Sequence, residues 1–379
     1  MRTPISLLVA AGLVGCAEPD PAELFYGTSV TSVRDEAAAA DAFVQRIASA
    51  QDTLHVAIPT GEDTAIADAL IEAWDRGVQV EVVTDVDVAD TEGIRRLLDA
   101  EVPVRLADAG LTYFEFSLNT DVVFTSEMTK MSDVWVVADR QSVLAASHVG
   151  SLADGTRILF DLKGEEIIED LLAEHNQLFG GTDATAVDAY DAPNKSITDF
   201  RWRYGTDSDV DLQMWFGPQE RLTKRIVDGI YGARSSIWVL TNDLANEGLT
   251  KALQDKAALG FDVRVVVGPN FGDSSSAVSR FFENETPDVD KRRVTDPVVP
   301  TLVILDWEDL PSGRRGQARG MVITHDLFNA ARLYRGNPVE TDQLIDGVMW
   351  ELATAATPTG DLQSLLDVWQ DHLDRSEAF

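Results

Sequence analysis

Two places in the sequence carry a hydroxyl that is directly followed by an imidazole, Ser147 with His148 and Thr324 with His325. Each pair follows an apolar segment that we expect to be a β-strand. If both imidazoles pointed into one site, they could transfer a phosphoryl group, or bind a metal ion together with aspartates that end the preceding strands. The alternation of side chains along a strand favours the opposite, because the residue beside an inward-pointing hydroxyl points to the other face.

A basic segment in an acidic chain is a second candidate for chemistry. Residues 291 to 335 contain eight basic and five acidic residues, a local net charge of +3 in a chain whose net charge is −33. Planar guanidinium groups suit phosphate or carboxylate, so the segment could bind an anion; alternatively, its arginines pair with neighbouring acids. The candidate anion-binding residues are Arg292, Arg293, Arg314, Arg315 and Arg319.

The charge of the whole chain disfavours a broad nucleic-acid interface. Asp plus Glu number 64 against 31 Lys plus Arg. A surface with this excess repels nucleic acid and anionic lipid at long range, so we expect no nucleic-acid partner. The single cysteine, Cys16, cannot form a disulfide within these 379 residues. The sequence has no Cys/His cluster with metal-ligand spacing, and it indicates no cofactor.

Residues 1–16 resemble the signal of a bacterial lipoprotein. A basic residue and a short apolar stretch precede LVGC at 13–16, which resembles a lipobox. In lipoproteins the cysteine is lipidated and becomes the first residue after cleavage, so we expect Cys16 to anchor the chain in a membrane. Ala17 and Glu18 favour the outer membrane of a Gram-negative cell envelope. A buried N-terminal helix and plain secretion are the alternatives.

An internal repeat predicts which elements position the candidate residues. Residues 47–85 and 230–268 align without a gap, at a constant offset of 183 residues. Their apolar positions coincide, and Gly77 coincides with Gly260. Each copy is typical of a helix end, a β-branched strand, a second helix and a second strand. Such units predict right-handed parallel crossovers, and therefore an α/β sheet covered by helices.

The repeat divides the chain into two lobes. We expect the first lobe at residues 17–181, a polar linker at 182–207 and the second lobe at 208–379. A helical pattern closes each lobe, at 164–181 and at 362–379. The length of 379 residues is consistent with two units of this size.

Each copy of the repeat resembles the phospholipase D superfamily, in which a helix ending A-x-x-R-G-V leads into a strand V-x-V-x-V-x-x-D. Residues 69–85, ALIEAWDRGVQVEVVTD, have this form. The resemblance covers most of residues 25–379 and implies two lobes related by a pseudo-twofold axis, each a mixed sheet flanked by helices. In the family each half contributes H-x-K-x(4)-D and then G-S. One histidine attacks phosphorus, the other protonates the leaving oxygen, and the lysines and the serine hold the phosphoryl oxygens without a metal.

The first half of the sequence departs from this motif at the residues that carry the chemistry. Asp139 takes the place of the motif aspartate, and Ser147 takes the place of the serine eight residues later. Counting back from Asp139 puts Ser132 where the family has histidine and Val134 where it has lysine. Ala146 replaces the glycine before the serine.

The second half departs from the motif in the same way. Asp306 takes the aspartate place at the end of an apolar strand, so the histidine place holds Val299 and the lysine place holds Thr301. An insertion at 307–320 lengthens the following turn, and Thr324 then takes the serine place. Both aspartates and both hydroxyls of the motif are therefore present, whereas both histidines and both lysines are absent.

The resemblance therefore implies a protein that is catalytically degenerate. Valine and serine supply neither a nucleophilic imidazole nor a cation for phosphoryl oxygens. Our first hypothesis is a lipid-anchored envelope protein that binds a phosphate-bearing or other anionic ligand, binds a protein partner that the sequence does not identify, or serves as a structural lipoprotein. One alternative is a divergent phosphodiesterase or phospholipase D-like hydrolase that uses His148 and His325. Another is a surface interaction module without a working cleft.

The remaining histidines are predicted to be structural. His55 lies within an expected strand and aligns with Trp238 of the second copy, so we expect a packed side chain. His175 and His372 lie in the closing helices, where we expect both to be exposed.

Overall fold

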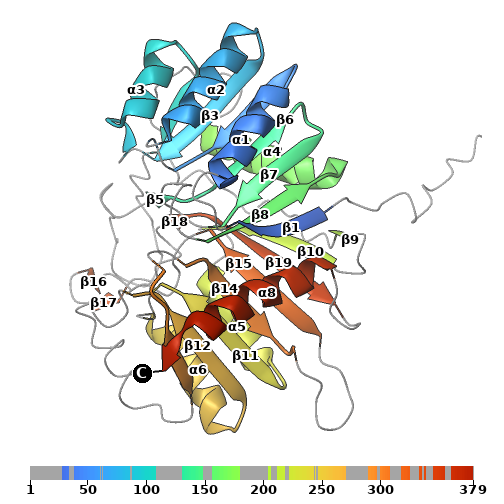
Figure 1. Ribbon diagram of the computed structural model, residues 1–379, viewed down its shortest axis with the longest axis vertical. Helices are drawn as coiled ribbons and strands as arrows, with labels where there is room; N and C mark the ends of the chain where they lie inside the picture. The colour runs from blue at the N-terminus through green and yellow to red at the C-terminus, as the bar shows by residue number, and fades with distance from the viewer. Residues whose placement is uncertain are drawn as a thin grey trace, which may run out of the picture.

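The protein is described by a computed structural model, which is shown in Figure 1. The structure describes residues 28–33, 38–59, 61, 63–85, 88–107, 130–147, 156–179, 204–205, 211–217, 222–242, 244, 246–269, 289–296, 299–307, 317–324, 333–334, 337–338, 345–354 and 360–378. Residues 1–16, with Cys16, lie outside these ranges. Among the helices of the described residues, none is both long and apolar enough to cross a membrane.

The first lobe is a seven-stranded mixed sheet in the order β1-β8-β7-β6-β2-β3-β4. Its strands are β1 (Thr28–Val33), β2 (Thr53–Ala57), β3 (Gln79–Asp85), β4 (Val104–Ala107), β6 (Trp135–Ala138), β7 (Ser142–Ala146) and β8 (Arg157–Leu162). Strands β2, β3 and β4 are parallel, whereas the β6, β7, β8 and β1 pairings are antiparallel. The helices are α1 (Ala38–Ser49), α2 (Thr64–Asp75), α3 (Glu92–Asp99) and α4 (Glu165–Phe179).

The second lobe is a nine-stranded mixed sheet in the order β20-β13-β12-β11-β14-β15-β19-β10-β9. Its strands are β9 (Tyr204–Gly205), β10 (Asp211–Phe216), β11 (Ser236–Thr241), β12 (Asp262–Val267), β13 (Asp290–Arg293), β14 (Thr301–Leu305), β15 (Ala318–Ile323), β19 (Val348–Thr354) and β20 (Glu377–Ala378). The helices are α5 (Leu222–Gly232), α6 (Glu247–Ala258) and α8 (Gly360–Arg375). Two short pairs complete the strands: β16 (Leu333–Tyr334) with β17 (Asn337–Pro338), and β5 (Lys130–Met131) with β18 (Ile345–Asp346).

The internal repeat forms the matching core of each lobe, as the sequence predicts. The parallel pair β2–β3 is linked by α2, and the parallel pair β11–β12 is linked by α6. Each linking helix ends before a glycine with positive φ, 89° at Gly77 and 85° at Gly260. Only glycine adopts this backbone conformation without strain, which explains why the glycines coincide in the two copies.

The boundaries differ from the prediction at two places. Residues 204–205, assigned to the linker, form strand β9, which pairs with β10 in the second sheet. The last predicted helix ends at Arg375, and Glu377–Ala378 form β20, which pairs with β13 at the sheet edge. The extra strand gives the edge strand β13 hydrogen-bond partners that it would otherwise lack.

Each sheet has an outer face covered by its own helices and an inner face turned toward the other lobe. In Figure 1 helices α1–α3 lie in the upper lobe, and helices α5 and α6 lie in the lower lobe. A third apolar cluster joins the two inner faces with α4 and α8. At this seam the Trp135 ring lies 6.4 Å from Phe216, and Phe160 stacks on Trp350 at 5.1 Å between centroids. Each pair joins one lobe to the other, so the lobes share a core.

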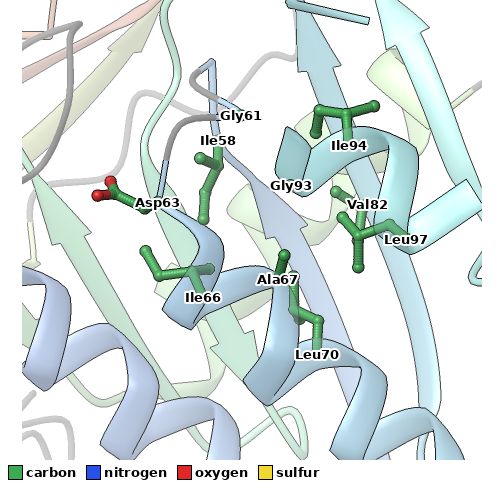
Figure 2. Close-up of a pocket in the computed structure, with 10 residues that line it drawn as sticks. All are labelled: Ile58, Gly61, Asp63, Ile66, Ala67, Leu70, Val82, Gly93, Ile94 and Leu97. Carbon is green, nitrogen blue, oxygen red and sulfur yellow. The ribbon is translucent and has the colours of Figure 1, made fainter. Parts of the chain in front are cut away.

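A small cavity lies where α2 and α3 pack over β3, and Figure 2 shows its lining. Its volume is about 20 Å³, and Asp63 is the one charged residue among those that line it. A cavity of this size holds about one water molecule and no substrate. Beside it the backbones approach closely, because Gly93 N–H donates to the Gly61 carbonyl at 3.0 Å.

We predict that Gly93→Ala destabilises the first lobe. A Cβ at Gly93 would lie 2.7 Å from the Gly61 carbonyl oxygen, so the backbone of one segment would have to move. Overpacking of this kind typically costs about 1–3 kcal/mol of unfolding free energy, which urea denaturation measures. Gly248→Ala in α6 is the matched control, because its Cβ would meet nothing closer than 3.4 Å. Equal stability of the two variants would contradict the prediction.

Candidate functional site

The motif places of the first half lie at the two ends of one β-hairpin. In the β6–β7 register Trp135 pairs with Ala145, so Ser132, Val134 and Ser147 lie at one end and Asp139 lies in the turn at the other. The five residues of β7 lie between Asp139 and Ser147, a rise of about 17 Å. The motif aspartate is therefore remote from the other motif places.

The Asp139 carboxylate binds backbone rather than lining a site. It accepts hydrogen bonds from the N–H groups of Gln51, Asp52 and Thr53, at 2.7 Å for Asp52 and 3.0 Å for Thr53. Burial acts to raise the pKa of Asp139, but the three backbone hydrogen bonds outweigh it, so the pKa lies below the usual value. The carboxylate thus ties the hairpin turn to the beginning of β2.

Asp306 performs the same role in the second lobe. Its carboxylate accepts from Arg234 N–H at 2.6 Å and from Ser235 N–H at 2.8 Å, at the beginning of β11. Both aspartates have left-handed backbones, with φ of 53° at Asp139 and 54° at Asp306. Aspartate tolerates this conformation better than most residues, so the hairpin geometry and the carboxylate bonds favour the same residue type.

The motif hydroxyls form hydrogen bonds with the backbone of neighbouring strands. Ser147 Oγ accepts from Ile158 N–H at 3.0 Å, and Thr324 Oγ1 accepts from Val348 N–H at 2.9 Å. In addition, the Ile158 carbonyl accepts from the Ser147 N–H, and the Val348 carbonyl accepts from the Thr324 N–H. Both side chains are 0% exposed. The two hydroxyls therefore hold strand ends together.

The histidine and lysine places are all buried. The exposed fractions are 1% for Ser132, 2% for Val134, 0% for Val299 and 1% for Thr301. Asn242 holds the backbone at Val299 from both sides, because its side-chain amide donates to the Val299 carbonyl and accepts from the Val299 N–H, each at 3.0 Å. These places contain no imidazole and no amine.

The described arginines do not converge on one anion site. Arg292 on β13 pairs with Asp290 at 3.3 Å, and Arg319 on β15 pairs with Glu351 at 3.6 Å. Three strands separate β13 from β15 in the sheet, a spacing of about 19 Å. Arg293 neighbours Arg292 on β13, whereas Arg314 and Arg315 lie outside the described residues. Arg292 and Arg319 are therefore close in the sequence but far apart in the folded sheet.

The two aspartates of the hypothesised metal site lie at the far ends of their hairpins from the motif hydroxyls. Asp139 lies at the turn end of its hairpin, whereas Ser147 lies at the open end. The Leu305–Arg319 pairing likewise puts Asp306 at the turn end, far from Thr324 at the open end. His148 and His325 themselves lie outside the described residues. Within the described ranges, no group of three or more His, Cys, Asp or Glu side chains is arranged to hold a metal ion.

Sequence reasoning missed a buried ionisable cluster in the first lobe. His175 is 0% exposed, contrary to the expectation, and its Nε2 lies 3.5 Å from Oε2 of Glu81. His55 Nε2 lies 3.8 Å from the same oxygen. His372 in the second lobe is also 0% exposed rather than solvated. The spacing of His175 from Ile168, two helical turns earlier, could have placed it on the buried face of α4.

Comparison with known proteins supports the fold assignment. Residues 43–126 match the family model described as cardiolipin synthase, PLD-like domain. No curated protein sequence matches the chain. The structure resembles phosphatidylserine synthase from Haemophilus influenzae Rd KW20, with a TM-score of 0.63 and 12% identity, over 93% of this chain and 87% of that one.

A second solved structure with a similar fold is the polyphosphate kinase of Porphyromonas gingivalis. The TM-score is 0.55 with 11% identity, over 91% of this chain and 50% of that chain. At these identities the likeness is one of fold and says nothing of a shared reaction. The match to phosphatidylserine synthase extends over both lobes, so the two-lobed α/β arrangement predicted from the repeat is confirmed.

We predict that Asp139→Ala destabilises the protein by about 2–4 kcal/mol, because three backbone N–H groups lose a charged acceptor. Asp139→Asn is the matched control, since it keeps one acceptor oxygen and should lose less than half as much. Urea denaturation at pH 7 measures both. Because the folded pKa of Asp139 is lowered, its contribution is present above the ordinary value and is lost as pH falls through the folded pKa. A loss below about 0.5 kcal/mol in Asp139→Ala would refute a structural role.

Proposed function

We propose that this chain is a non-catalytic member of the phospholipase D superfamily. The fold of both lobes and the family match at residues 43–126 support the membership. We further propose that a lipid on Cys16 anchors it in the bacterial cell envelope, in the outer membrane of a Gram-negative host. Its role there is to bind another molecule rather than to cleave a phosphodiester.

The observation that carries the proposal is the content of the four places where the family has histidine or lysine. They hold Ser132, Val134, Val299 and Thr301, each at most 2% exposed. Phosphodiester cleavage by this fold needs a nucleophile and a separate general acid, and loss of the acid alone typically lowers the rate about 10²- to 10⁴-fold. No side chain at these places supplies either group.

The remaining motif residues make hydrogen bonds that stabilise the fold. Asp139 and Asp306 hold hairpin turns to the beginnings of β2 and β11, and Ser147 and Thr324 hold strand ends. Their presence therefore supports no catalytic role. These hydrogen bonds explain how the fold remains stable without the histidines and lysines of the family motif.

The charges of the described residues favour a protein partner over an anionic ligand. Arg292 and Arg319 each pair with a carboxylate, and they lie on strands separated by three others. The net charge of −33 would repel a free anion at long range. The same charge would attract a basic partner surface and raise its association rate.

We predict no phosphodiester hydrolysis by the protein. Residues 17–379 are incubated with a chromogenic phosphodiester and with phospholipid vesicles, beside the His148→Ala/His325→Ala double variant and a phospholipase D with intact motifs. The rate should equal that of the double variant. Turnover that the double substitution abolishes would instead identify a divergent hydrolase that uses these two histidines, and would refute the non-catalytic proposal.

We predict that the lipid anchor depends on Cys16. Expression of the full chain in a Gram-negative host should place it in the detergent-extracted membrane fraction, whereas Cys16→Ser should leave it unlipidated and uncleaved at this site. Mass spectrometry of the N-terminal peptide measures the lipid directly. An unmodified Cys16 in the membrane-bound protein would contradict lipidation.

A further inference from the structure

A cluster of three ionisable side chains joins helix α4 to the inner face of the first sheet. His55 comes from β2, Glu81 from β3 and His175 from α4. The two imidazole rings meet edge to face with centroids 5.2 Å apart. The His55 side chain is 16% exposed and that of His175 is 0% exposed, whereas Glu81 is 34% exposed. His55 lies opposite Val137 in the β2–β6 pairing, two residues from Asp139.

The cluster holds one carboxylate for two imidazoles. Oε2 of Glu81 lies 3.5 Å from His175 Nε2 and 3.8 Å from His55 Nε2. Glu81 can therefore balance one imidazolium, but a second proton would place two positive rings against each other inside the protein. Burying an uncompensated charge is strongly unfavourable. The geometry thus tolerates the neutral pair and resists full protonation.

The charged groups around the cluster do not supply a second counter-charge. Arg140, in the turn after β6, adds positive charge near His55. Arg105 on β4 donates through Nε to the Phe179 carbonyl at the end of α4, at 2.8 Å. On α4 itself, Asp170 and Glu174 are buried and have polar partners of their own. Glu81 is the carboxylate shown facing both rings.

The pKa of His55 is shifted in the direction that this geometry predicts. Burial, the neighbouring His175 and Arg140 lower its pKa from 6.5 to about 4, against the attraction of Glu81. A lowered histidine pKa means that the folded state binds fewer protons than the unfolded chain. The stabilisation is therefore complete above pH 6.5 and is lost as pH falls from 6.5 toward 4.

The second lobe lacks this cluster at the equivalent place. Trp238 aligns with His55 and stacks on Trp369 of α8, with ring centroids 4.7 Å apart. Arg264 aligns with Glu81 and lies over the Trp238 ring at 5.1 Å. The buried His372 lies 3.3 Å through Nε2 from Asp296, and Arg375 of α8 contacts the same carboxylate at 2.7 Å. Helix α8 is therefore held by aromatic stacking and by contacts with Asp296.

We propose that His55, Glu81 and His175 form an acid-operated latch that holds α4 against the first sheet at neutral pH and releases it on mild acidification. Release would uncover the apolar side of α4, which includes Leu171 and Leu178. It would also uncover part of the inner face of the sheet. The first lobe, and not the second, would thereby gain an apolar surface in acid.

The test is hydrogen exchange of the α4 and α8 amides between pH 7.5 and 5, corrected for intrinsic exchange rates. Protection of α4 should fall roughly 10- to 30-fold at pH 5, as expected for a histidine pKa that falls from 6.5 to about 4 on folding. Protection of α8 in the same sample should change by a smaller factor. A parallel fall in both helices would overturn the proposal.

Two variants make the cause specific. His55→Gln cannot be protonated, so the loss of α4 protection in acid should largely disappear. Glu81→Gln removes the one counter-charge to the rings, so the fall between pH 7.5 and 5 should remain at least as large. Circular dichroism at pH 7.5 shows which variants fold. An unchanged fall in His55→Gln, or a smaller fall in Glu81→Gln, would refute the latch.

Discussion

The packing of the two sheets against each other across one apolar seam is the constraint on which the rest of the structure depends. Trp135 and Phe160 of the first lobe meet Phe216 and Trp350 of the second. Aromatic rings bury large areas and prefer such stacked and edge-to-face pairs. Trp135 begins β6, directly after Ser132 and Val134. The packing that joins the lobes therefore also excludes solvent from these two motif places. A catalytic site at this position would need polar groups that are stable when buried.

The two halves share a framework and differ in what they place on it. Asp139 and Asp306 make equivalent bonds to backbone N–H groups, so that part of the motif is a folding device. The inner faces have diverged, with ionisable side chains at His55 and Glu81 of one lobe and an aromatic stack around Trp238 in the other. A duplicated scaffold can therefore carry different side chains at equivalent places without a change of fold.

These features together describe a protein with a phospholipase D-like fold whose proposed role is binding. The proposed lipid anchor would hold the acidic body near a membrane surface that, where it carries anionic lipid, repels it. We propose that such a body binds basic partner surfaces. The proposed latch at His55 would allow acidification to change the surface that the first lobe exposes. Neither property requires the catalytic histidines and lysines that the motif places lack.

The sequence by itself determined the repeat, the two α/β lobes and the residue types at the motif places, because apolar phase and a glycine such as Gly77 are local properties of the chain. The tertiary structure decided which side chains meet. It separated Asp139 from Ser147 by a hairpin length, kept Arg292 away from Arg319 and buried His175 against Glu81. Those outcomes depend on strand order and on which helix face packs inward, and both arise from long-range packing that linear spacing does not encode.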